Sequence, residues 1–430
     1  MQHHSPTTAK TRGTALAVST AALLGTAALF TGAPAHAAGL PARPAPVPAP
    51  AFSGDAYGSS VRLGSTVLSG RSAPVTLGCT NTAGATRTNS TASLTVPLLA
   101  SAGTTTTTAA TSTSPSTAVT TARAEELDLL GGLVTASALQ VTSTTTRTAS
   151  GFTTTSDGTS FTDLRVAGRA LPSAPAANTR VELPALGHVV LNEQVVVNTA
   201  KGASLEVNGV HVVVDQKNLL GFKVGTDIVI SHARSGLSAP VAGVLGGFAY
   251  GSQLTVGPLV KTGPTFRRVL PCLGTEGAQR ATTGAGLDLS PVLTTGAVRN
   301  TAQGVVSGST FYGDTSSTID ATSLLDGLVS ATAITAHAGV ELSATNERTY
   351  SGAGSTFGTL SVAGHPEIDA AVPANTEIAL PGVGTLYLHR VLRSGNHVEV
   401  RMVELVLSAP VGTLPAGADL RVGVAAASLG

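Results

Sequence analysis

Two cysteines offer the clearest covalent chemistry in this chain. Cys79 and Cys272 each follow a Tyr-Gly-Ser motif at the same interval, counted from Tyr57 and Tyr250. The shared interval places the two cysteines at corresponding positions of two similar stretches of sequence. In a chain that is exported, cysteines so placed predict one disulfide between the two stretches. Closing a loop of about 193 residues sets a ceiling near 5 kcal/mol on its stabilisation. Two buried free thiols or a bridge between molecules are the alternatives. Catalytic thiols are not expected, because the sequence has no Cys-x-x-Cys pair.

Histidine and carboxylate side chains could perform hydrolysis, but none lies in a motif that hydrolases use. The sequence has no Gly-x-Ser-x-Gly, Ser-x-x-Lys or His-Glu-x-x-His. Beyond the N-terminal segment the histidines stand singly, as His188, His211, His232, His337, His365, His389 and His397. We therefore predict that the chain is not an enzyme and has no catalytic residue, no metal site and no cofactor.

A glycosidase would need two carboxylates about 5–9 Å apart. Asp227 and Asp419 are the carboxylates that repeat cleanly, and their Gly-x-Asp setting favours a turn or capping role. His211 corresponds to Glu404, so the copies do not share that chemistry. A hydrolase stays an alternative only if the fold gathers two or more of a scattered set in one cleft, namely Asp163, Glu193, His211, His389 and Glu404.

Composition excludes some partners. Charged residues make up 11% of the 430 residues and the formal net charge is +1, which argues against binding to nucleic acid. Hydrophobic residues make up 42%, too many for a disordered chain. The sequence has no Trp and only five Tyr, which weakens any carbohydrate-stacking role for Tyr57, Tyr250 or Tyr312.

The chain after its N-terminal segment is an internal duplication. Besides the Tyr-Gly-Ser and Cys matches, Leu-Leu-Gly-Gly-Leu-Val at 129–134 recurs as Leu-Leu-Asp-Gly-Leu-Val at 324–329. A period this long indicates two domain-sized copies rather than a solenoid. We place copy 1 at 57–235, a joint at 236–249 and copy 2 at 250–430.

A second repeated pattern joins Ala-Asn-Thr to Leu-Pro-x-x-Gly. A corner explains it better than a ligand loop: Asn would bond the backbone through its side chain and Gly would permit a positive φ. The residues of this repeated structural motif are Asn178, Pro184 and Gly187 in copy 1, and Asn375, Pro381 and Gly384 in copy 2.

Strand signals run through both copies. Val134 to Thr148 alternates small apolar residues with Thr, Ser and Gln, and turn residues such as Asn208-Gly209 separate short β-branched runs, a pattern typical of hairpins. Ala122 to Leu130 alone has a helical look. The run Thr104–Thr108 fits either a linker or a surface strand. The fold class predicted is all-β, with two tandem β-sandwich-like domains.

The N-terminus reads as an export signal. Residues 1–37 combine Lys10 and Arg12, an apolar stretch from Gly13 to Phe30 and an Ala-His-Ala cleavage site ending at Ala37. A Pro- and Ala-rich spacer follows at 38–56. No later segment is apolar enough for a membrane span, so we predict a secreted chain.

The order of these motifs resembles the actinobacterial choice-of-anchor P family. The motifs are Tyr-Gly-Ser, Leu-Leu-Gly-Gly-Leu-Val-Thr-Ala, Leu-x-Val-Ala-Gly, Ala-Asn-Thr and Leu-Pro-x-x-Gly. The resemblance implies an exported surface protein and no enzyme activity. We expect a secreted structural or adhesion-type protein of the cell envelope or extracellular space, loosely surface-associated, that binds cell-wall glycan or itself. A glycan-binding module is the alternative.

Overall fold

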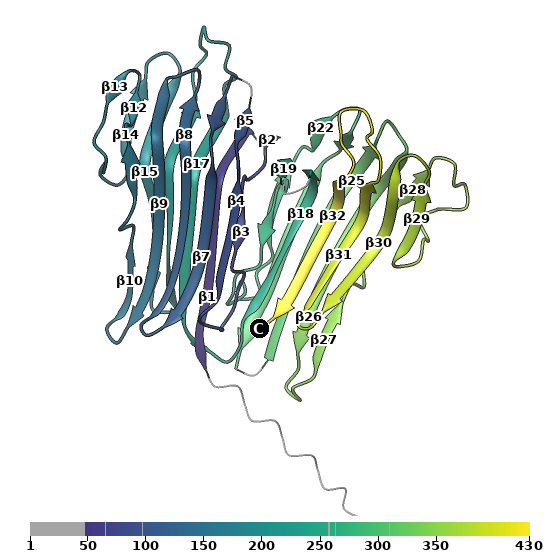
Figure 1. Cartoon of the computed structure of the whole chain (residues 1–430). Coiled ribbons are helices and arrows are strands. Elements are labelled where there is room, and N and C mark those ends of the chain that lie inside the picture. Colours follow the sequence, from purple (N-terminus) through teal and green to yellow (C-terminus); the bar gives the residue numbers. More distant parts are fainter. Residues whose placement is uncertain (1–47, 65, 97, 257–258, 263, 309) are drawn as a thin grey trace, which may run out of the picture. The chain divides into compact units, whose positions relative to one another are not determined.

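The computed structural model describes residues 48–430 except 65, 97, 257–258, 263 and 309. The predicted signal segment 1–37 lies outside the described residues, as does the spacer up to residue 47. The described residues form four antiparallel β-sheets, so the all-β prediction is confirmed (Figure 1). No helix in the described part of the chain is long and apolar enough to cross a membrane.

The first half, residues 48–241, contains two of these sheets. Sheet A has the order β14 (Thr179–Leu183), β15 (Gly187–Thr199), β16 (Gly202–Val214), β17 (Thr226–Val241), β1 (Ala49–Leu63) and β2 (Thr66–Ser69), with β3 (Val75–Thr76) also on β1. Sheet B is built around β7 (Thr105–Thr113), β8 (Ser116–Leu129) and β9 (Val134–Thr148). Its remaining strands are β4 (Thr86–Thr91), β5 (Leu94–Val96), β6 (Ala100–Ala102), β10 (Gly151–Thr155), β11 (Ser160–Thr162), β12 (Arg165–Val166) and β13 (Arg169–Ala170).

The second half, residues 242–430, repeats this order of strands. Sheet C runs β29 (Thr376–Leu380), β30 (Gly384–Ser394), β31 (His397–Leu407), β32 (Ala418–Leu429), β18 (Leu245–Val256) and β19 (Leu259–Thr262), with β20 (Arg268–Val269) also on β18. Sheet D is built around β24 (Val298–Ser307), β25 (Thr310–Leu324) and β26 (Val329–Leu342). It adds β21 (Arg280–Gly284), β22 (Leu287–Leu289), β23 (Leu293–Thr295), β27 (Arg348–Ser351) and β28 (Thr359–Val362).

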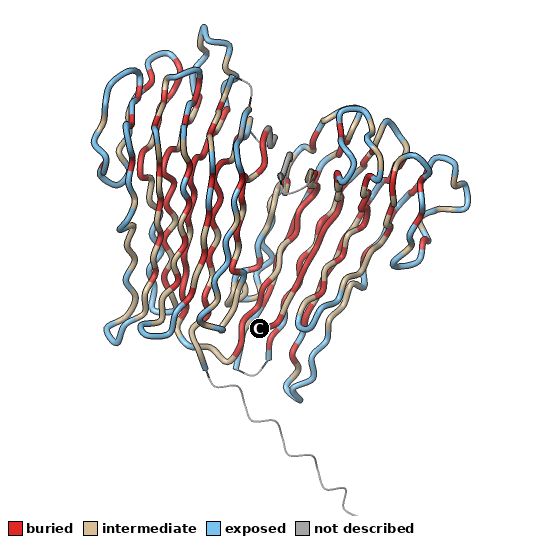
Figure 2. The backbone as a smooth tube through the Cα atoms, in the orientation of Figure 1, coloured by how far each residue is buried: buried red, intermediate tan, exposed pale blue. Residues whose placement is uncertain are grey.

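Each half has its own apolar core between its two sheets. In the first half Leu139 and Val141 of β9 join Leu205 and Val207 of β16 in one buried cluster. The largest cluster of the second half is made entirely of its own residues. Figure 2 shows buried residues along the middle of the long strands and exposed residues at the loops. Alternation of apolar and polar residues thus gives each sheet an inner face toward the core and an outer face toward solvent.

Three local predictions are settled by the strands. The threonine run belongs to β7, paired with β4 and β8, so it is an ordered strand. The helical interpretation of Ala122 to Leu130 is wrong, because residues 122–129 lie in β8 between β7 and β9. Pairing on both edges outweighs its weak helical preference.

The predicted hairpin turn at Asn208-Gly209 is also wrong. Both residues lie inside β16, where Gly209 has no partner in the register with either neighbour. Asn192, Ser231 and Gly58 are left out of the register in the same way, so one residue of each strand is unpaired in a line across sheet A while the register on either side is unchanged. We call this line of unpaired residues the bulge row. The one unpaired residue in each strand reverses the alternation of faces, so that Val207 and Val210 both lie in the core. As a result, Asn208 and His211 both lie on the outer face.

Sheet C has a matching bulge row at His389, Met402, Gly423 and Gly251, again without a shift in register. There the row places Arg401 and Glu404 on one outer face. The two bulge rows therefore position the polar side chains described below.

The predicted spacer and joint contain more strand than expected. β1 begins at Ala49, where it pairs with Val241, and so takes up the last part of the 38–56 segment. Of the 236–249 segment, the first part belongs to β17 and the last part to β18, which leaves 242–244 between them.

Candidate functional site

A chain of polar contacts crosses the outer face of sheet A. Arg71 contacts Asp55 at 3.1 Å, and Asp55 lies 3.6 Å from Nε2 of His232. Nδ1 of His232 and the amide oxygen of Asn208 are 2.7 Å apart. Nδ2 of Asn208 donates to Glu193 at 2.8 Å.

The chain continues to the far side of the sheet. Glu193 lies 2.9 Å from Nδ1 of His211, and Asp227 lies 2.9 Å from Nε2 of the same ring. Arg62 approaches the other oxygen of Asp227 at 3.5 Å. The sequence predicted a turn or capping role for Asp227; instead, Asp227 lies in β17 and its carboxylate belongs to this ion-pair chain.

His211 is held as an imidazolium. The hydrogen bonds to Asp227 and Glu193 raise its pKa to about 9. The hydrogen bond from His211 lowers the pKa of Glu193. Burial alone would raise the pKa of Asp227, but the hydrogen bond and the charge of His211 outweigh burial, so the pKa of Asp227 is lowered. A histidine with both ring nitrogens donating to carboxylates has no lone pair with which to accept a proton. The arrangement stabilises charge and does not provide a general base.

Tyr57 is enclosed within this face. Its ring stacks on His232 with 4.3 Å between centroids, and the guanidinium of Arg71 lies 4.4 Å from the ring centre. Burial raises the pKa of the Tyr57 hydroxyl to about 12. Because other side chains lie against the ring, Tyr57 offers no open platform for a sugar.

Sheet C carries a different cluster at the same strand positions. Glu404 is 2% exposed and contacts three arginines: Arg390 at 2.6 Å, Arg421 at 3.4 Å, and Arg401. The arginines have further partners, because Arg421 also binds Asp419 and Arg401 also binds Glu399 at 2.6 Å. Burial would raise the pKa of Glu399, but the His397 and Arg401 contacts outweigh it and hold the pKa at about 2.

A hydrolase would need two or more of five scattered side chains gathered in one cleft, and only two of the five come together. Glu193 and His211 come within hydrogen-bond reach, on the outer face of a sheet. Asp163 accepts a hydrogen bond from Ser137 in an exposed position, and Glu404 lies among arginines. His389 forms part of the bulge row, and burial lowers its pKa. Among the described residues, no group of three or more His, Cys, Asp or Glu side chains is arranged to hold a metal ion.

The repeated Asn residues close the edge of their sheets in the same way. The side-chain oxygen of Asn178 accepts from the backbone of Gln194 at 2.7 Å, and that of Asn375 accepts from Val391 at 2.7 Å. Both residues have positive φ, 58° and 63°. Each Asn is the residue just before β14 or β29. Its side chain thus bonds one further backbone N–H of β15 or β30, on the far side of the bulge row from β14 or β29.

The Leu-Pro-x-x-Gly segments are the turns between those strands. Leu183 pairs with Gly187, and Leu380 pairs with Gly384, so Pro184 and Pro381 lie in the turns. A Cβ at Gly187 would lie 2.0 Å from the carbonyl oxygen of Val213, and one at Gly384 would lie 2.1 Å from that of Val406. Close approach to the next strand explains both glycines.

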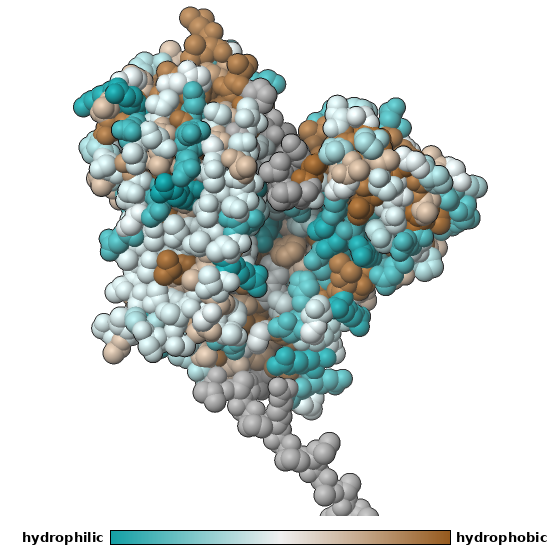
Figure 3. Space-filling model, viewed as in Figure 1, coloured by the Kyte–Doolittle hydropathy of each residue, from teal (hydrophilic) through white to brown (hydrophobic). Residues whose placement is uncertain are grey.

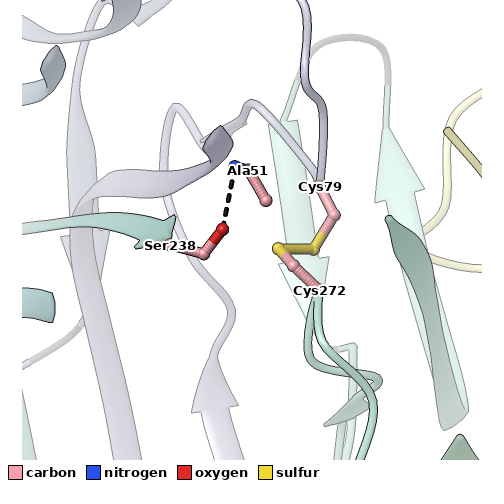
Figure 4. Close-up of a disulfide and its surroundings, with 4 residues drawn as sticks. All are labelled: Ala51, Cys79, Ser238 and Cys272. Atoms are coloured by element: carbon pink, nitrogen blue, oxygen red, sulfur yellow. Dashed lines mark hydrogen bonds between the residues drawn. A yellow bond between two sulfur atoms is a disulfide. The ribbon is translucent and has the colours of Figure 1, made fainter. Parts of the chain in front are cut away.

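The predicted disulfide is present. Cys79 and Cys272 are bonded, with 5.2 Å between their Cα atoms (Figure 4). Beside it the backbone N–H of Ala51 donates to the hydroxyl of Ser238 at 2.9 Å, which fastens the start of β1 to β17. The bond joins the segment after β3 to the segment after β20.

Tyr250 and Tyr312 differ in exposure. Tyr250 is 4% exposed, and its ring stacks on Phe248 with 5.9 Å between centroids. Tyr312 is 43% exposed and hydrogen-bonds Asp314; burial and that bond raise its pKa to about 12. Of the predicted aromatic platforms, only Tyr312 has an accessible ring.

Comparison of the chain with protein-family models, with curated proteins and with solved structures gave no match.

Proposed function

We propose that the chain is an exported, non-enzymatic structural protein of the cell envelope or extracellular space that acts by self-association. The saturated ion pairs of sheets A and C support a non-enzymatic role, since their groups already bind one another. The surface in Figure 3 is mostly of intermediate hydropathy, which suits broad contacts rather than steering by charge.

One observation carries the proposal: the open edge of β15. β14 pairs with residues 187–191, and beyond them the described residues place no strand on that side. Gln194 directs its N–H toward this edge, so by the two-residue period Val196 and Asn198 do so as well. Three consecutive valines here, Val195, Val196 and Val197, are 53%, 53% and 51% exposed.

The edge carries no charge along Gln194 to Thr199. Unpaired N–H and C=O groups beside exposed β-branched residues form a template for another strand. A second copy of this chain is the occupant we propose. Antiparallel pairing of two identical β15 edges is isologous, because each edge meets the same edge of its partner and both satisfy their backbone groups.

The matching edge in sheet C lacks these features. Position 196 corresponds in register to Arg393 of β30, since Val196 lies opposite Leu205 and Arg393 lies opposite Val398. A charged residue at this place is a common protection against edge pairing. The first half therefore has an unprotected edge where the second half has a protected one.

Sedimentation equilibrium of residues 38–430 over a range of concentrations tests the proposal. We expect reversible association that Val196→Arg weakens strongly. Val224→Arg is the matched control, because Val224 is 50% exposed but lies outside the edge. A monomer at all concentrations, or equal effects of the two substitutions, would contradict self-association through β15.

Co-sedimentation with insoluble cell walls, chitin and cellulose tests the glycan-binding alternative. Pelleting with one glycan, unaffected by Val196→Arg, would favour a glycan-binding module over self-association. No pelleting together with Val196-dependent association would favour the proposal.

We also propose that the two halves are β-sandwich domains produced by duplication, in keeping with the family resemblance. The matching strand orders, bulge rows and Asn bonds support this idea. Cleavage at a protease site inserted between residues 242 and 244 should leave two folded halves joined by the disulfide. Simultaneous degradation of both halves would contradict it.

A further inference from the structure

A cavity of about 210 Å³ is lined by side chains from both halves of the chain. One wall comes from the segment between β2 and β3 with Arg71, and the other from β18, the loop before β20 and the outer face of sheet C. We call it the arginine pocket and define it by Arg71, Phe248, Tyr250, Arg267, Glu399 and Arg421. This volume is below the several hundred Å³ of pockets for drug-sized ligands and suits one small ring.

Arg267 is the arginine of this pocket that lacks a carboxylate. Arg71 has Asp55 at 3.1 Å, and Arg421 has Asp419 at 2.5 Å. Among the residues that the structure describes, no acidic side chain forms an ion pair with Arg267. Burial, and then the charge of Arg71, lower its pKa to about 10, and the attraction of Asp55, which is itself paired with Arg71, offsets only part of this. A desolvated cation without a counter-ion is costly, and a bound anion would relieve that cost.

Aromatic packing fixes the orientation of Arg267. Its guanidinium carbon lies 5.2 Å from the centre of Phe248, whose ring stacks on Tyr250. A guanidinium held by its face still presents its N–H edge, and that fork matches the two oxygens of a carboxylate.

The opposite side of the pocket sets a second requirement. Glu399 is ionised, with a pKa of about 2; Arg401 takes its Oε1 at 2.6 Å, and its Oε2, 3.6 Å from His397, is the oxygen left to meet a ligand. An ionised carboxylate accepts hydrogen bonds from hydroxyl groups and repels a second negative charge. The ligand should therefore carry one anionic group and several hydroxyls on a small ring.

We propose that the arginine pocket binds a carboxylate-bearing sugar, with its carboxylate on Arg267 and its hydroxyls toward Glu399. This binding is separate from self-association through β15, which lies at the far edge of sheet A. The ligand class includes a free sugar acid and the terminal unit of an acidic polysaccharide.

Ligand-observed saturation-transfer NMR with the disulfide-bonded chain tests the proposal, with D-glucuronate, D-glucose and inorganic phosphate as probes. We expect glucuronate to bind at least about tenfold more tightly than glucose, because a charge-assisted bond is lost with glucose. Equal binding of the two sugars, or none, would overturn the proposal. Displacement of glucuronate by phosphate at equal concentration would show a simple anion site and overturn the sugar assignment.

Variants locate the binding. Arg267→Gln should weaken glucuronate binding by at least about tenfold and leave glucose unchanged. Arg62→Gln is the matched control, because Arg62 is also an arginine on an outer face but lies outside the pocket. If Arg267→Gln fails to fold, Phe248→Leu provides a second measurement, because loss of the stacked ring should also weaken binding. Full glucuronate binding in a folded Arg267→Gln or Phe248→Leu variant would overturn the proposal.

Discussion

The outer faces of sheets A and C carry opposite charges at the same two register positions. In sheet A the acid Glu193 on β15 meets the cation His211 on β16 at 2.9 Å. In sheet C the cation Arg390 on β30 meets the acid Glu404 on β31 at 2.6 Å. Glu193 lies opposite Asn208 across the strands, and Arg390 lies opposite Arg401 in the same way.

The difference shows what this position requires. A residue next to the bulge row is partly buried, so a charge there needs a partner of opposite sign on the neighbouring strand. Either orientation of the pair meets the requirement, but a change on one strand alone does not. The inverted pair also explains why His211 and Glu404 correspond in sequence without sharing a chemical role.

The largest expected effect comes from removing the acid of sheet C. Glu404→Gln leaves three arginines without their common carboxylate, and Arg390 with no other described acidic partner. Breaking a buried ion pair from one side costs about 3–5 kcal/mol, and the amide of Gln recovers part of it. Urea unfolding of the variant measures the loss of unfolding free energy. Exposed Glu377→Gln is the control, and an equally small loss in both variants would contradict the role of Glu404.

The pH dependence of stability should distinguish the two clusters. The pKa of His211 is raised from 6.5 to about 9, so its stabilisation is complete below pH 6.5 and is lost as the pH rises through 9. After allowance for solvent screening we expect a loss of about 2 kcal/mol between pH 7 and 10. The arginines of sheet C stay charged across that range.

Urea unfolding at pH 7 and pH 10 checks this expectation. His211→Gln should lose stability at pH 7 and show a flatter pH profile than the unmodified chain. Glu404→Gln should keep the full slope. The prediction fails if His211→Gln and the unmodified chain lose the same amount of stability between the two pH values.

Much of the fold could be predicted from the sequence, because alternation, turn residues and paired motifs are local signals. The long strand at Val134–Thr148 and the disulfide are examples. The hairpin predicted at Asn208-Gly209 was wrong because Asn-Gly also fits where a continuous strand carries one unpaired residue, and only the register of neighbouring strands distinguishes the two.

The ion-pair clusters were missed for a different reason. Comparing His211 with Glu404 alone suggested unrelated residues, whereas the compensating pair Glu193 and Arg390 lies on the preceding strand. The sequence spacing between corresponding positions of the two halves differs between these strands, as Gly187 with Gly384 and His211 with Glu404 show. Aligning each strand separately would have revealed the inverted pair.

A smaller loss of unfolding free energy is expected at the Asn bonds, which have the same geometry in both halves. Asn178→Ala and Asn375→Ala each remove one side-chain bond to the backbone, worth about 1 kcal/mol, and place Ala at positive φ. The Gly variants lose the bond without the backbone strain, so they should be less harmful than the Ala variants. Equal losses at the two sites, measured by urea unfolding, would confirm one shared role. A loss at only one site would show that the matching geometry does not reflect matching energetics.

The smallest effect on stability, within about 0.5 kcal/mol, is expected at the exposed edge position of sheet C. Arg393→Val removes the charge from β30 at the place that Val196 occupies on β15. In a Val196→Arg background it should restore the self-association lost from the first half, because the open edge is then moved to the second half. Sedimentation equilibrium of the single and double variants measures the association. If the double variant stays monomeric while both variants fold, charge at this position does not decide which edge pairs, and the three consecutive valines of β15 themselves must supply the contact.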